Sequence, residues 1–586
     1  MADPANAVIA AALEELGDLY ELDGAVIHRV LAYRNAARSV RDASTSVAAL
    51  ARVGRATELH GVGATLAQKI GVLVQTGSIP AAEKLRARFP AGLIELTRLP
   101  GVGPKRARLL YDELAIASLQ DLRQAALDQR LRTVRGFGAR FEEGVLAALA
   151  DGVDVQPRGE RVLLPRALGA AEAVAAALAE RGGEDVRVCV AGSARRRADS
   201  VTDLDLVAAS KQPAQLAGAL AELDLIESVS SAAESGARGR THTGVRVDLR
   251  VVTPDRFGNL LQHFTGSGRH NSSLREAAVR RGLHVSEYGI ARDGDSHVLR
   301  CASEEEVYAH LGLAWMEPEL REDRGELQAA SILDGAGLPR LVDVRDIRGD
   351  LHCHTIASDG HNTIEEMAVA ARERGYEYLA ITDHSASHGF GNDVSADELR
   401  RQIERVHEVD ARLEGIRLLA GSEVNVLPDG SLDYEDDLLA ELDWVVASVH
   451  TAFATGEAAM TERVVRAVEH PLVDVIGHPT GRLIERREPY AIDLEAVIAA
   501  AVRSGTMLEI NGNPDRRDLN DVHARAAAAA GVAIVIDSDA HRVQTLAVMR
   551  WGVATARRAW LSAADVTNTL SWPDFDARRK RRRLQP

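Results

Sequence analysis

Nine residues in the C-terminal part of the sequence carry side chains of the kind that bind transition metals. They are His352, His354, Asp359, His384, Glu423, His450, His478, Asp539 and His541. Imidazole and carboxylate ligands together suit Zn²⁺, Mn²⁺ or iron, whereas a site for Mg²⁺ normally uses oxygen ligands alone. A single histidine after a strand is usually structural, but this set of nine predicts a metal site.

The apolar runs around these residues predict the fold that brings them together. Strand candidates alternate with helical patterns after residue 346, and they are Leu351, Tyr378–Thr382, Ile416–Ala420, Trp444–Val449, Val473–Ile476, Met507–Ile510 and Val532–Ile536. This alternation predicts parallel strands in a (β/α)7-type barrel. The active site of such a barrel lies at the carboxyl ends of its strands, which is where the nine residues fall.

A second group of carboxylates lies in the middle of the chain, where a helical pattern precedes short β-branched runs typical of an α+β domain. Asp203 and Asp205 lie two residues apart on a predicted strand and therefore share one face, and Asp248 lies on another strand. Three such carboxylates can hold two divalent ions, Mg²⁺ or Mn²⁺, that activate a 3′-hydroxyl and neutralise a triphosphate. The turn Gly192-Ser193, followed by Arg196, predicts a phosphate cradle.

Residues 1–150 have helical periodicity and contain three Gly-X-Gly turns, at Gly61 and Gly63, Gly101 and Gly103, and Gly136 and Gly138. Paired glycines allow a tight turn that exposes backbone N–H groups at the start of the next helix, where a phosphate can bind. One such turn is an ordinary helix–helix connection. Three of them predict helix-hairpin-helix contacts with DNA.

The charge distribution is compatible with a nucleic-acid partner at the front of the chain. The net charge of −16 divides into +3 for residues 1–150, −6 for residues 151–340 and −13 for residues 341–586. The basic run Arg578–Arg583 predicts a disordered arm. Three scattered cysteines argue against a disulfide framework, and the sequence has neither a secretion-signal pattern nor an apolar stretch long enough for a membrane span. We therefore expect a cytoplasmic protein.

The front of the sequence resembles the N-terminal domain of DNA polymerase beta and its bacterial family X relatives. The residues that carry this likeness are Ala32-Tyr33-Arg34-Asn35-Ala36-Ala37, the first hairpin and Ala67-Gln68-Lys69-Ile70. The resemblance implies that Lys69 attacks a deoxyribose 5′-phosphate as a nucleophile. The alternative is that Lys69 only binds phosphate. Arg29, preceded by His28, stands where the family often has a lysine in the phosphate pocket.

The middle of the sequence resembles the nucleotidyltransferase fold of the same family. This resemblance implies that Ser193 and Arg196 bind the triphosphate with Gly192, and that Arg246 contacts DNA. The motif Phe264-Thr265-Gly266-Ser267-Gly268-Arg269-His270-Asn271 is similar to the family's nucleotide pocket. The resemblance implies that Phe264, Gly266 and Asn271 bind the nucleotide, with Asn271 at the edge of the base. Asn271 is alternatively only a helix cap. His263 stands where the family usually has a tyrosine beside the sugar.

The back of the sequence resembles the PHP family of metal-dependent phosphoesterases over residues 346–560. The resemblance implies three ions: one held by His352, His354, Glu423 and Asp539; one that Glu423 shares with His450 and His478; and one held by Asp359, His384 and His541. In bacterial family X enzymes this domain is a 3′-to-5′ exonuclease. Some PHP domains have lost ligands and become scaffolds, but all nine ligands are present in this chain.

The expected architecture is multidomain, with an all-α helix-hairpin-helix region, an α+β nucleotidyltransferase domain and a (β/α)7-type PHP barrel. The expected boundaries are 1–90 for a DNA-binding, lyase-like domain, 91–155 for further hairpins, 156–316 for the nucleotidyltransferase, 317–345 for a linker, 346–575 for the PHP domain and 576–586 for a basic tail.

The expected function is filling of short DNA gaps in repair by a monomeric polymerase in the bacterial cytoplasm, associated with the nucleoid. Its partners would be deoxynucleoside triphosphates and gapped or primer-template DNA. One alternative is a PHP phosphoesterase that uses the front of the chain only to hold DNA. Intact Asp203, Asp205 and Asp248 argue against it. The other alternative is a noncatalytic DNA-binding adaptor, which two complete sets of ligands oppose.

Overall fold

The computed structural model describes residues 3–97, 99, 101–134, 136–150, 161–389 and 392–580. The chain forms two compact units. The first comprises Met1–Arg161, Ala170–Cys189 and Thr202–Thr253, and the second comprises Val162–Gly169, Val190–Val201 and Pro254–Pro586. Two residues of the predicted hairpin segments, Pro100 and Arg135, lie outside the described residues.

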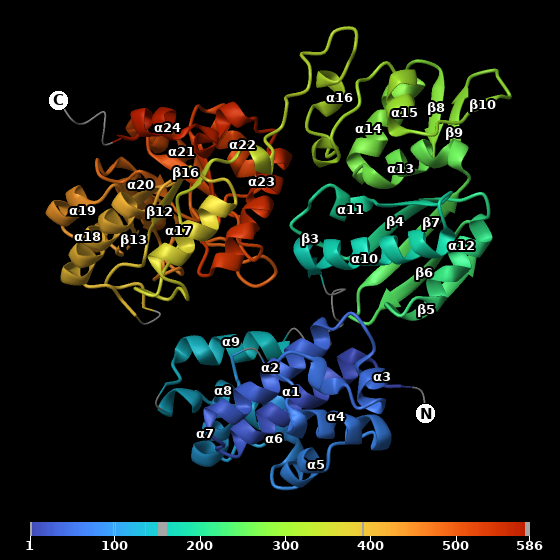
Figure 1. The fold of residues 1–586 in the computed structure, drawn as a ribbon. Helices are drawn as coiled ribbons and strands as arrows, with labels where there is room; N and C mark the ends of the chain where they lie inside the picture. The colour runs from blue at the N-terminus through green and yellow to red at the C-terminus, as the bar shows by residue number, and fades with distance from the viewer. Residues whose placement is uncertain are drawn as a thin grey trace. The chain divides into compact units, whose positions relative to one another are not determined.

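The described part of residues 3–150 is helical, as the sequence predicts (Figure 1). Its α-helices are α1 (Asn6–Leu22), α2 (Ile27–Asp42), α3 (Val47–Arg52), α4 (Ala64–Thr76), α5 (Pro80–Arg86), α6 (Ala91–Leu96), α7 (Pro104–Leu114), α8 (Leu119–Leu127) and α9 (Ala139–Ala150). Apolar residues three or four positions apart, such as Ile9, Leu13 and Leu16 of α1, are fully buried in one core shared by these helices.

Each of the three hairpin turns contains a glycine in the left-handed region. The φ angles are 75° at Gly61, 80° at Gly101 and 95° at Gly136, which residues with a side chain adopt at a cost. The second glycine of each turn directly precedes α4, α7 or α9. The N–H groups at the starts of these helices are therefore presented by the turns, as a phosphate contact requires.

The first unit also contains a five-stranded mixed sheet in the order β2-β4-β7-β6-β5. The strands are β2 (Arg187–Val190), β4 (Asp203–Ala209), β5 (Ile226–Ala233), β6 (Gly236–Thr241) and β7 (Arg246–Val252), and α10 (Leu164–Gly182) precedes β2. β4 and β7 are parallel neighbours in which Asp205 is opposite Asp248, whereas β5, β6 and β7 are antiparallel. The β-branched runs near 186, 204 and 245 thus form strands, as predicted.

The second unit begins with the elements around the predicted nucleotide pocket. They are α11 (Gly192–Arg195), α13 (Phe257–Thr265), α14 (Gly268–Val279), α15 (Glu304–His310) and an antiparallel sheet of β8 (Leu283–Ser286), β9 (Gly289–Arg292) and β10 (Val298–Leu299). β1 (Val162–Leu163) pairs with β3 (Ser200–Val201). α14, the small sheet and α15 share a core that includes Leu274, Ile290 and Tyr308.

The rest of the second unit is the predicted barrel of seven parallel strands (Figure 1). The strands follow one another in chain order as β11 (Gly349–Asp350), β12 (Tyr378–Ile381), β13 (Arg417–Asn425), β14 (Trp444–Ser448), β15 (Val475–Ile476), β16 (Met507–Asn511) and β17 (Ile534–Asp537). A parallel bridge between Cys353 and Ala540 brings the chain after the last strand back to the first. The predicted number of strands is therefore confirmed, and six of them overlap the predicted runs, whereas β11 ends one residue before the candidate Leu351.

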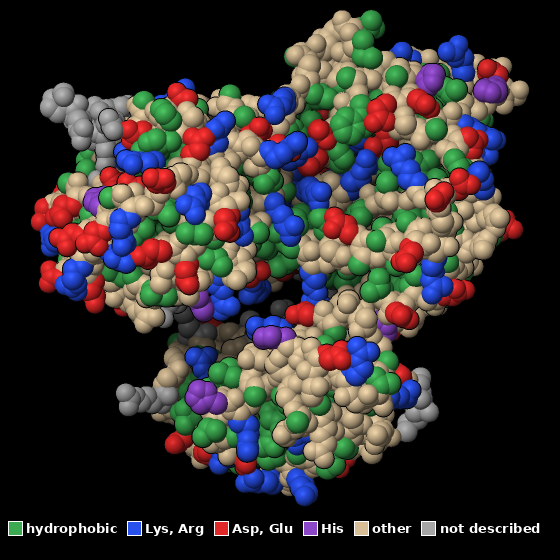
Figure 2. All heavy atoms as spheres, viewed as in Figure 1, with side chains coloured by type: hydrophobic (Ala, Val, Ile, Leu, Met, Phe, Trp, Pro, Cys, Tyr) green, Lys and Arg blue, Asp and Glu red, His purple; other side chains and the backbone are tan. Residues whose placement is uncertain are grey.

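Strand alternation divides the apolar side chains of the barrel between two cores. Tyr378, Ala380 and Trp444 face an inner cluster that Phe575 of α24 (Trp572–Arg578) joins. Leu379 and Ile381 instead join the outer core. The main helices of the barrel are α17 (Ile364–Glu373), α18 (Ala396–Arg412), α19 (Asp436–Glu441), α20 (Glu457–Glu469), α21 (Leu494–Ser504), α22 (Asp521–Ala529) and α23 (Met549–Arg558). Figure 2 shows Asp and Glu side chains gathered over α18 and α19, in agreement with the negative charge of this region.

Two stretches outside the barrel are more ordered than their composition indicates. The predicted linker 317–345 contains α16 (Glu326–Ala329) and buries Leu320, Arg321 and Glu326. The prediction of a disordered arm from residue 578 is wrong at its start, because Lys580 Nζ donates hydrogen bonds to the carbonyls of His470 and Val473, both at 3.0 Å. Residues 581–586 of the predicted tail lie outside the described residues. Within the described part of the chain, no helix combines the length and apolar character needed to cross a membrane.

Candidate active sites

The structure brings the nine predicted metal ligands together at the carboxyl ends of the barrel strands. His352 and His354 follow β11, His384 follows β12, Glu423 lies in β13, and His450, His478, Asp539 and His541 follow later strands, while Asp359 lies in the loop after β11. Seven of the nine are buried, and only Asp359 and His541 are partly exposed. Convergence of strand ends is a property of the barrel, so residues far apart in sequence meet there.

Glu423 is the centre of this cluster. Its Oε1 lies 2.8 Å from His478 Nε2 and 3.2 Å from His450 Nε2. Its Oε2 lies 2.9 Å from His384 Nδ1 and 3.4 Å from His352 Nε2. The two oxygens of one carboxylate thus face different histidines, so that each oxygen could contribute to a different ion.

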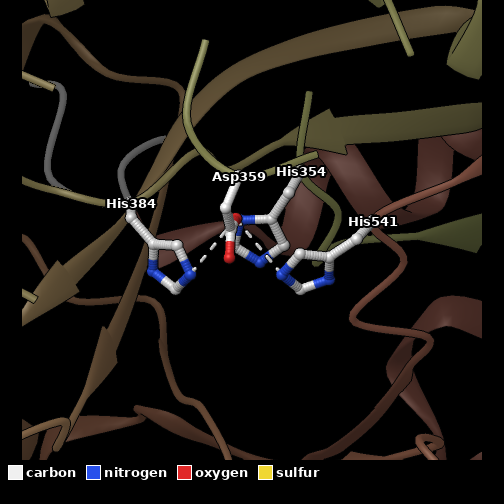
Figure 3. A group of neighbouring side chains, drawn as sticks. All are labelled: His354, Asp359, His384 and His541. Carbon is white, nitrogen blue, oxygen red and sulfur yellow. Dashed lines mark ion pairs between the residues drawn. The ribbon is translucent and has the colours of Figure 1, made fainter. Parts of the chain in front are cut away.

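Two further carboxylates complete the cluster. Asp539 Oδ1 lies 3.2 Å from His354 Nε2, and Asp359 Oδ1 lies 3.3 Å from His541 Nε2 and 3.6 Å from His384 Nε2. Figure 3 shows His354, His384 and His541 arranged around Asp359. The ring nitrogens of His354 and of His384 point to different carboxylates, so that each ring lies between two groups of ligands.

The side chains form three groups within reach of a metal ion. The groups are His352, His354 and Asp539; His384, Glu423 and His450; and His354, Asp359, His384 and His541. This grouping differs from the predicted one because both His354 and His384 are shared, whereas His478 contacts Glu423 from the side of Oε1. All nine predicted residues nevertheless belong to one connected cluster.

The electrostatics of the cluster suit cations. Burial would raise the pKa of Glu423, but His450, His352 and His384 hold this pKa well below its usual range. Burial, together with His541 and His384, lowers the pKa of His354 to about 4, which leaves its imidazole neutral and able to bind a metal. Within the described residues, Nε2 of His352 and both ring nitrogens of His354 are buried and lie near carboxylates without making a hydrogen bond of good geometry. These residues therefore fit divalent ions of the type that imidazole and carboxylate prefer.

Sequence reasoning missed the residues that orient these ligands. Glu509 is fully buried, and its carboxylate lies 2.7 Å from His352 Nδ1 and accepts a hydrogen bond from the N–H of His478 at 2.5 Å. Asp383 accepts hydrogen bonds from Thr355 and Ser358, in the loop that carries Asp359. Carboxylates behind metal-bound histidines fix the ring orientation. The signal in the sequence is a charged residue, Glu509, inside an apolar strand.

The three carboxylates of the first unit also lie as their strands predict. Asp203 and Asp205 of β4 share one face, and Asp248 is directly opposite Asp205 on β7. Asp248 lies 3.0 Å from Arg238 Nε and 2.8 Å from Arg250 Nε, while Arg246 lies 3.7 Å from Asp203. Asp203, Asp248, Arg238 and Arg246 line a cavity of about 400 Å³ with Ser228 and Ser230. The arginines balance the negative charge that two nearby aspartates create.

The predicted nucleotide-pocket residues belong to the second unit, where their contacts are specific. Gly192 begins α11 with φ 59°, and Arg196 ends the turn with its guanidinium bonded to Glu322 at 2.9 Å and to the carbonyl of Thr265 at 2.9 Å. Asn271 is not the helix cap, because Ser267 Oγ caps α14. Asn271 instead donates a hydrogen bond to the carbonyl of His263 at 2.7 Å.

His263 is partly buried between neighbours of both charge signs. Its ring is 5.4 Å from that of Phe264, and its Nε2 lies 3.9 Å from the carboxylate of Glu287. Burial lowers the pKa of His263, with Glu287 acting in the opposite direction and Arg275 in the same one. The imidazole is therefore predominantly neutral at pH 7.

In the helical region, the predicted residue Lys69 lies half-buried on α4, which follows the first hairpin. Arg29 stacks on the ring of Tyr20 with its guanidinium carbon 5.0 Å from the ring centre. The structure gives Arg29 an aromatic neighbour that the sequence did not indicate.

Family models match most of the chain. Residues 4–79 match the helix-hairpin-helix domain, residues 93–151 the SAM-like helix-hairpin-helix tandem, residues 260–322 the DNA polymerase beta thumb, and residues 350–513 the PHP domain. Among curated proteins, probable phosphatases match about a third of the chain. One from Syntrophotalea carbinolica is 30% identical over 230 residues, covering 37% of this chain and 90% of the phosphatase. One from Thermoanaerobacter sp. is 33% identical over 211 residues, covering 33% and 78%.

A relative that matches the whole chain is the DNA polymerase/3′-5′ exonuclease PolX of Bacillus subtilis. It is 37% identical over 577 residues, which cover 97% of this chain and 98% of the relative. The match therefore extends over the helical region, the five-stranded sheet and the barrel. The chain belongs to the bacterial family X DNA polymerases that carry a C-terminal PHP domain.

Proposed function

We propose that this chain is a DNA-directed DNA polymerase with a metal-dependent 3′-to-5′ exonuclease in its PHP barrel. The observation that supports the proposal is that one chain holds two separate carboxylate sets, one on paired strands of the five-stranded sheet and one among the histidines of the barrel. Asp205 and Asp248 face each other on paired strands, and Glu423 is surrounded by histidines.

In nucleotide addition, Asp203, Asp205 and Asp248 would hold Mg²⁺ or Mn²⁺. When bound, these ions supply Lewis-acid activation of the primer 3′-hydroxyl and neutralisation of the triphosphate. Gly192, Ser193 and Arg196 bind the phosphates of the nucleotide, while His263, Phe264, Gly266 and Asn271 line its sugar and base. Arg238 and Arg250 hold the carboxylate of Asp248 in a fixed orientation, at 3.0 and 2.8 Å.

In the exonuclease, the nine barrel residues would hold Zn²⁺, Mn²⁺ or iron, up to three ions, which when bound supply an activated water and charge neutralisation at the scissile phosphate. Glu509 fixes the ring of His352 and the backbone of His478.

The substrate that fits the helical region best is gapped or primer-template DNA, held by backbone N–H groups at Gly61, Gly63, Gly101, Gly103, Gly136 and Gly138, with Arg246 as a further contact. We assign the protein to short-gap filling in repair, as a monomer in the cytoplasm, associated with the nucleoid. We propose Lys69 as the nucleophile of a 5′-deoxyribose-phosphate lyase, with phosphate binding as its alternative role.

One experiment distinguishes the proposal from its two alternatives, a phosphoesterase that only holds DNA and a noncatalytic DNA-binding adaptor. Wild-type protein should incorporate labelled nucleotide on gapped DNA and shorten single-stranded DNA from its 3′ end. Asp205→Ala should abolish incorporation and leave the exonuclease, whereas His352→Ala should do the reverse. A phosphoesterase that only holds DNA would not incorporate nucleotide, and an adaptor would show neither activity. Loss of both activities in Asp205→Ala would refute the two-site proposal.

A further inference from the structure

The loop after α11 is held by side chains of the PHP barrel, although it belongs to the polymerase part of the sequence. The loop and the barrel are parts of the same compact unit. Asp199 Oδ2 accepts a hydrogen bond from Arg482 at 2.8 Å, and Asp199 Oδ1 lies 3.1 Å from Arg517. Ser200 Oγ donates a hydrogen bond to Glu485 at 2.7 Å. The loop, residues 196–199, leads into β3, which ends at Val201, two positions before Asp203.

Barrel arginines also satisfy the end of α11. The last carbonyls of a helix have no partner within the helix and carry partial negative charge. Arg558 donates a hydrogen bond to the carbonyl of Arg196 at 2.8 Å, and Arg517 donates one to the carbonyl of Arg197 at 3.0 Å. The carbonyls of the C-cap residue of α11 and of the residue after it are therefore bound by cations from another part of the chain.

Arg517 is built into this junction at some energetic cost. Its side chain is fully buried, and its backbone has a φ of 46°, in the left-handed region that residues with a side chain rarely adopt. Burial lowers its pKa to about 10, against the opposing effect of Asp199. Its Nε donates a hydrogen bond to Thr555 Oγ1 at 2.9 Å. A buried guanidinium of this kind is stable only when its partners are present, so the loop and Arg517 fix each other.

Arg516, the residue before Arg517, faces the metal cluster instead. Arg516 Nε lies 3.8 Å from Asp539 Oδ2, and Asp518 accepts a hydrogen bond from the N–H of Thr480, two residues after His478. Consecutive arginines thus contact a ligand of the exonuclease site and the loop of the polymerase site.

We propose that Arg482 and Arg517 of the PHP barrel are positioning residues for nucleotide addition, because they hold the loop that fixes the triphosphate-binding turn. The inference rests on the proposed polymerase function and on the assignment of Ser193 and Arg196 to the triphosphate. The barrel would then contribute to nucleotide addition independently of its own exonuclease chemistry.

The test compares Asp199→Asn and Arg517→Lys with a matched control, Arg503→Lys. Asp199→Asn keeps the shape of the side chain and removes the charge that both arginines face, while Arg517→Lys keeps the charge and loses the forked geometry. Arg503 is an exposed barrel arginine paired only with Glu469 among the contacts described, at 2.7 Å. Each protein is assayed on gapped DNA for the KM and kcat of nucleotide addition, and on single-stranded DNA for the exonuclease.

We expect the KM for nucleotide to rise about tenfold in Asp199→Asn and in Arg517→Lys, with a smaller change in kcat, since a loosened turn weakens binding first. The exonuclease rate of Asp199→Asn and both activities of Arg503→Lys should equal those of the wild type. An unchanged KM in both variants would overturn the proposal. So would a parallel loss of both activities with a lower melting temperature, because the contacts would then only stabilise the fold. Failure of the wild type to add nucleotide would instead refute the proposed function.

Discussion

Glu509→Ala tests whether a residue behind the ligands controls metal binding in the barrel. Glu509 is fully buried and offers one oxygen to His352 Nδ1 at 2.7 Å and the other to the N–H of His478 at 2.5 Å and to Asn511 Nδ2 at 3.2 Å. Removing the carboxylate frees the ring of His352 and lowers the basicity of its metal-binding nitrogen. Loss of such a partner reduces metal affinity by roughly 10- to 100-fold, or about 1.4 to 2.7 kcal/mol.

The assay is the exonuclease rate of chelator-treated protein as a function of added Mn²⁺. We expect the midpoint of the Mn²⁺ curve to move to a roughly 10- to 100-fold higher concentration, with most of the maximal rate restored at saturating Mn²⁺. Glu509→Gln should have an intermediate midpoint. Its amide oxygen can still accept a hydrogen bond from His352, whereas its NH₂ group would face two donors on the other side. Polymerisation on gapped DNA serves as the folding control. An unchanged midpoint with a lower maximal rate would refute the orienting role.

Four further results are expected. The exonuclease should be faster in Mn²⁺ than in Mg²⁺, because imidazole is a poor ligand for Mg²⁺, and equal rates in chelator-treated protein would contradict the ligand assignment. Borohydride should trap a covalent adduct of 5′-deoxyribose-phosphate DNA that Lys69→Ala reduces strongly; unchanged trapping would leave Lys69 as a phosphate contact. His263→Tyr should sharpen the preference for deoxynucleotides over ribonucleotides through added bulk, and identical selectivity would show that this side chain does not guard the sugar. Burial would raise the pKa of Glu304, but Arg321 and Arg195 lower it to about 2. Glu304 therefore contributes about 3 kcal/mol to the free energy of unfolding at neutral pH, and this contribution is lost as the pH falls from about 4.5 towards 2. Glu304→Gln should lower the free energy of unfolding at pH 7 and remove this acid dependence, as denaturant titrations at pH 7 and at acid pH would show.

The barrel was the most predictable part of the molecule. Buried parallel strands read as short continuous apolar runs, and the polar residue that follows each run must lie at the shared end of the strands. This geometry is why His352, Glu423 and His478 could be placed in one site from the sequence alone. The three Gly-X-Gly turns were equally readable, because only glycine adopts their left-handed φ without cost.

Residues whose role depends on a distant partner could not be predicted. Glu509 interrupts an apolar run, but its two partners come from other strands. The ring nitrogens of His354 and His384 are shared between groups because of how the rings are rotated, which spacing does not encode. The acidic stretch after Glu317 resembled a linker by composition, whereas in the structure the guanidinium of Arg321 pairs with Glu304 in a buried ion pair.

The segment from Asn513 to Asp518 limits the changes in length that this protein can accept between species. Arg516 and Arg517 are consecutive, yet one contacts the metal cluster and the other contacts Asp199. A single inserted or deleted residue would displace both side chains at once, so that a change compatible with the contacts of one site would disrupt the contacts of the other. Natural variation in this segment should therefore consist of substitutions at constant length, in contrast to the exposed barrel loops.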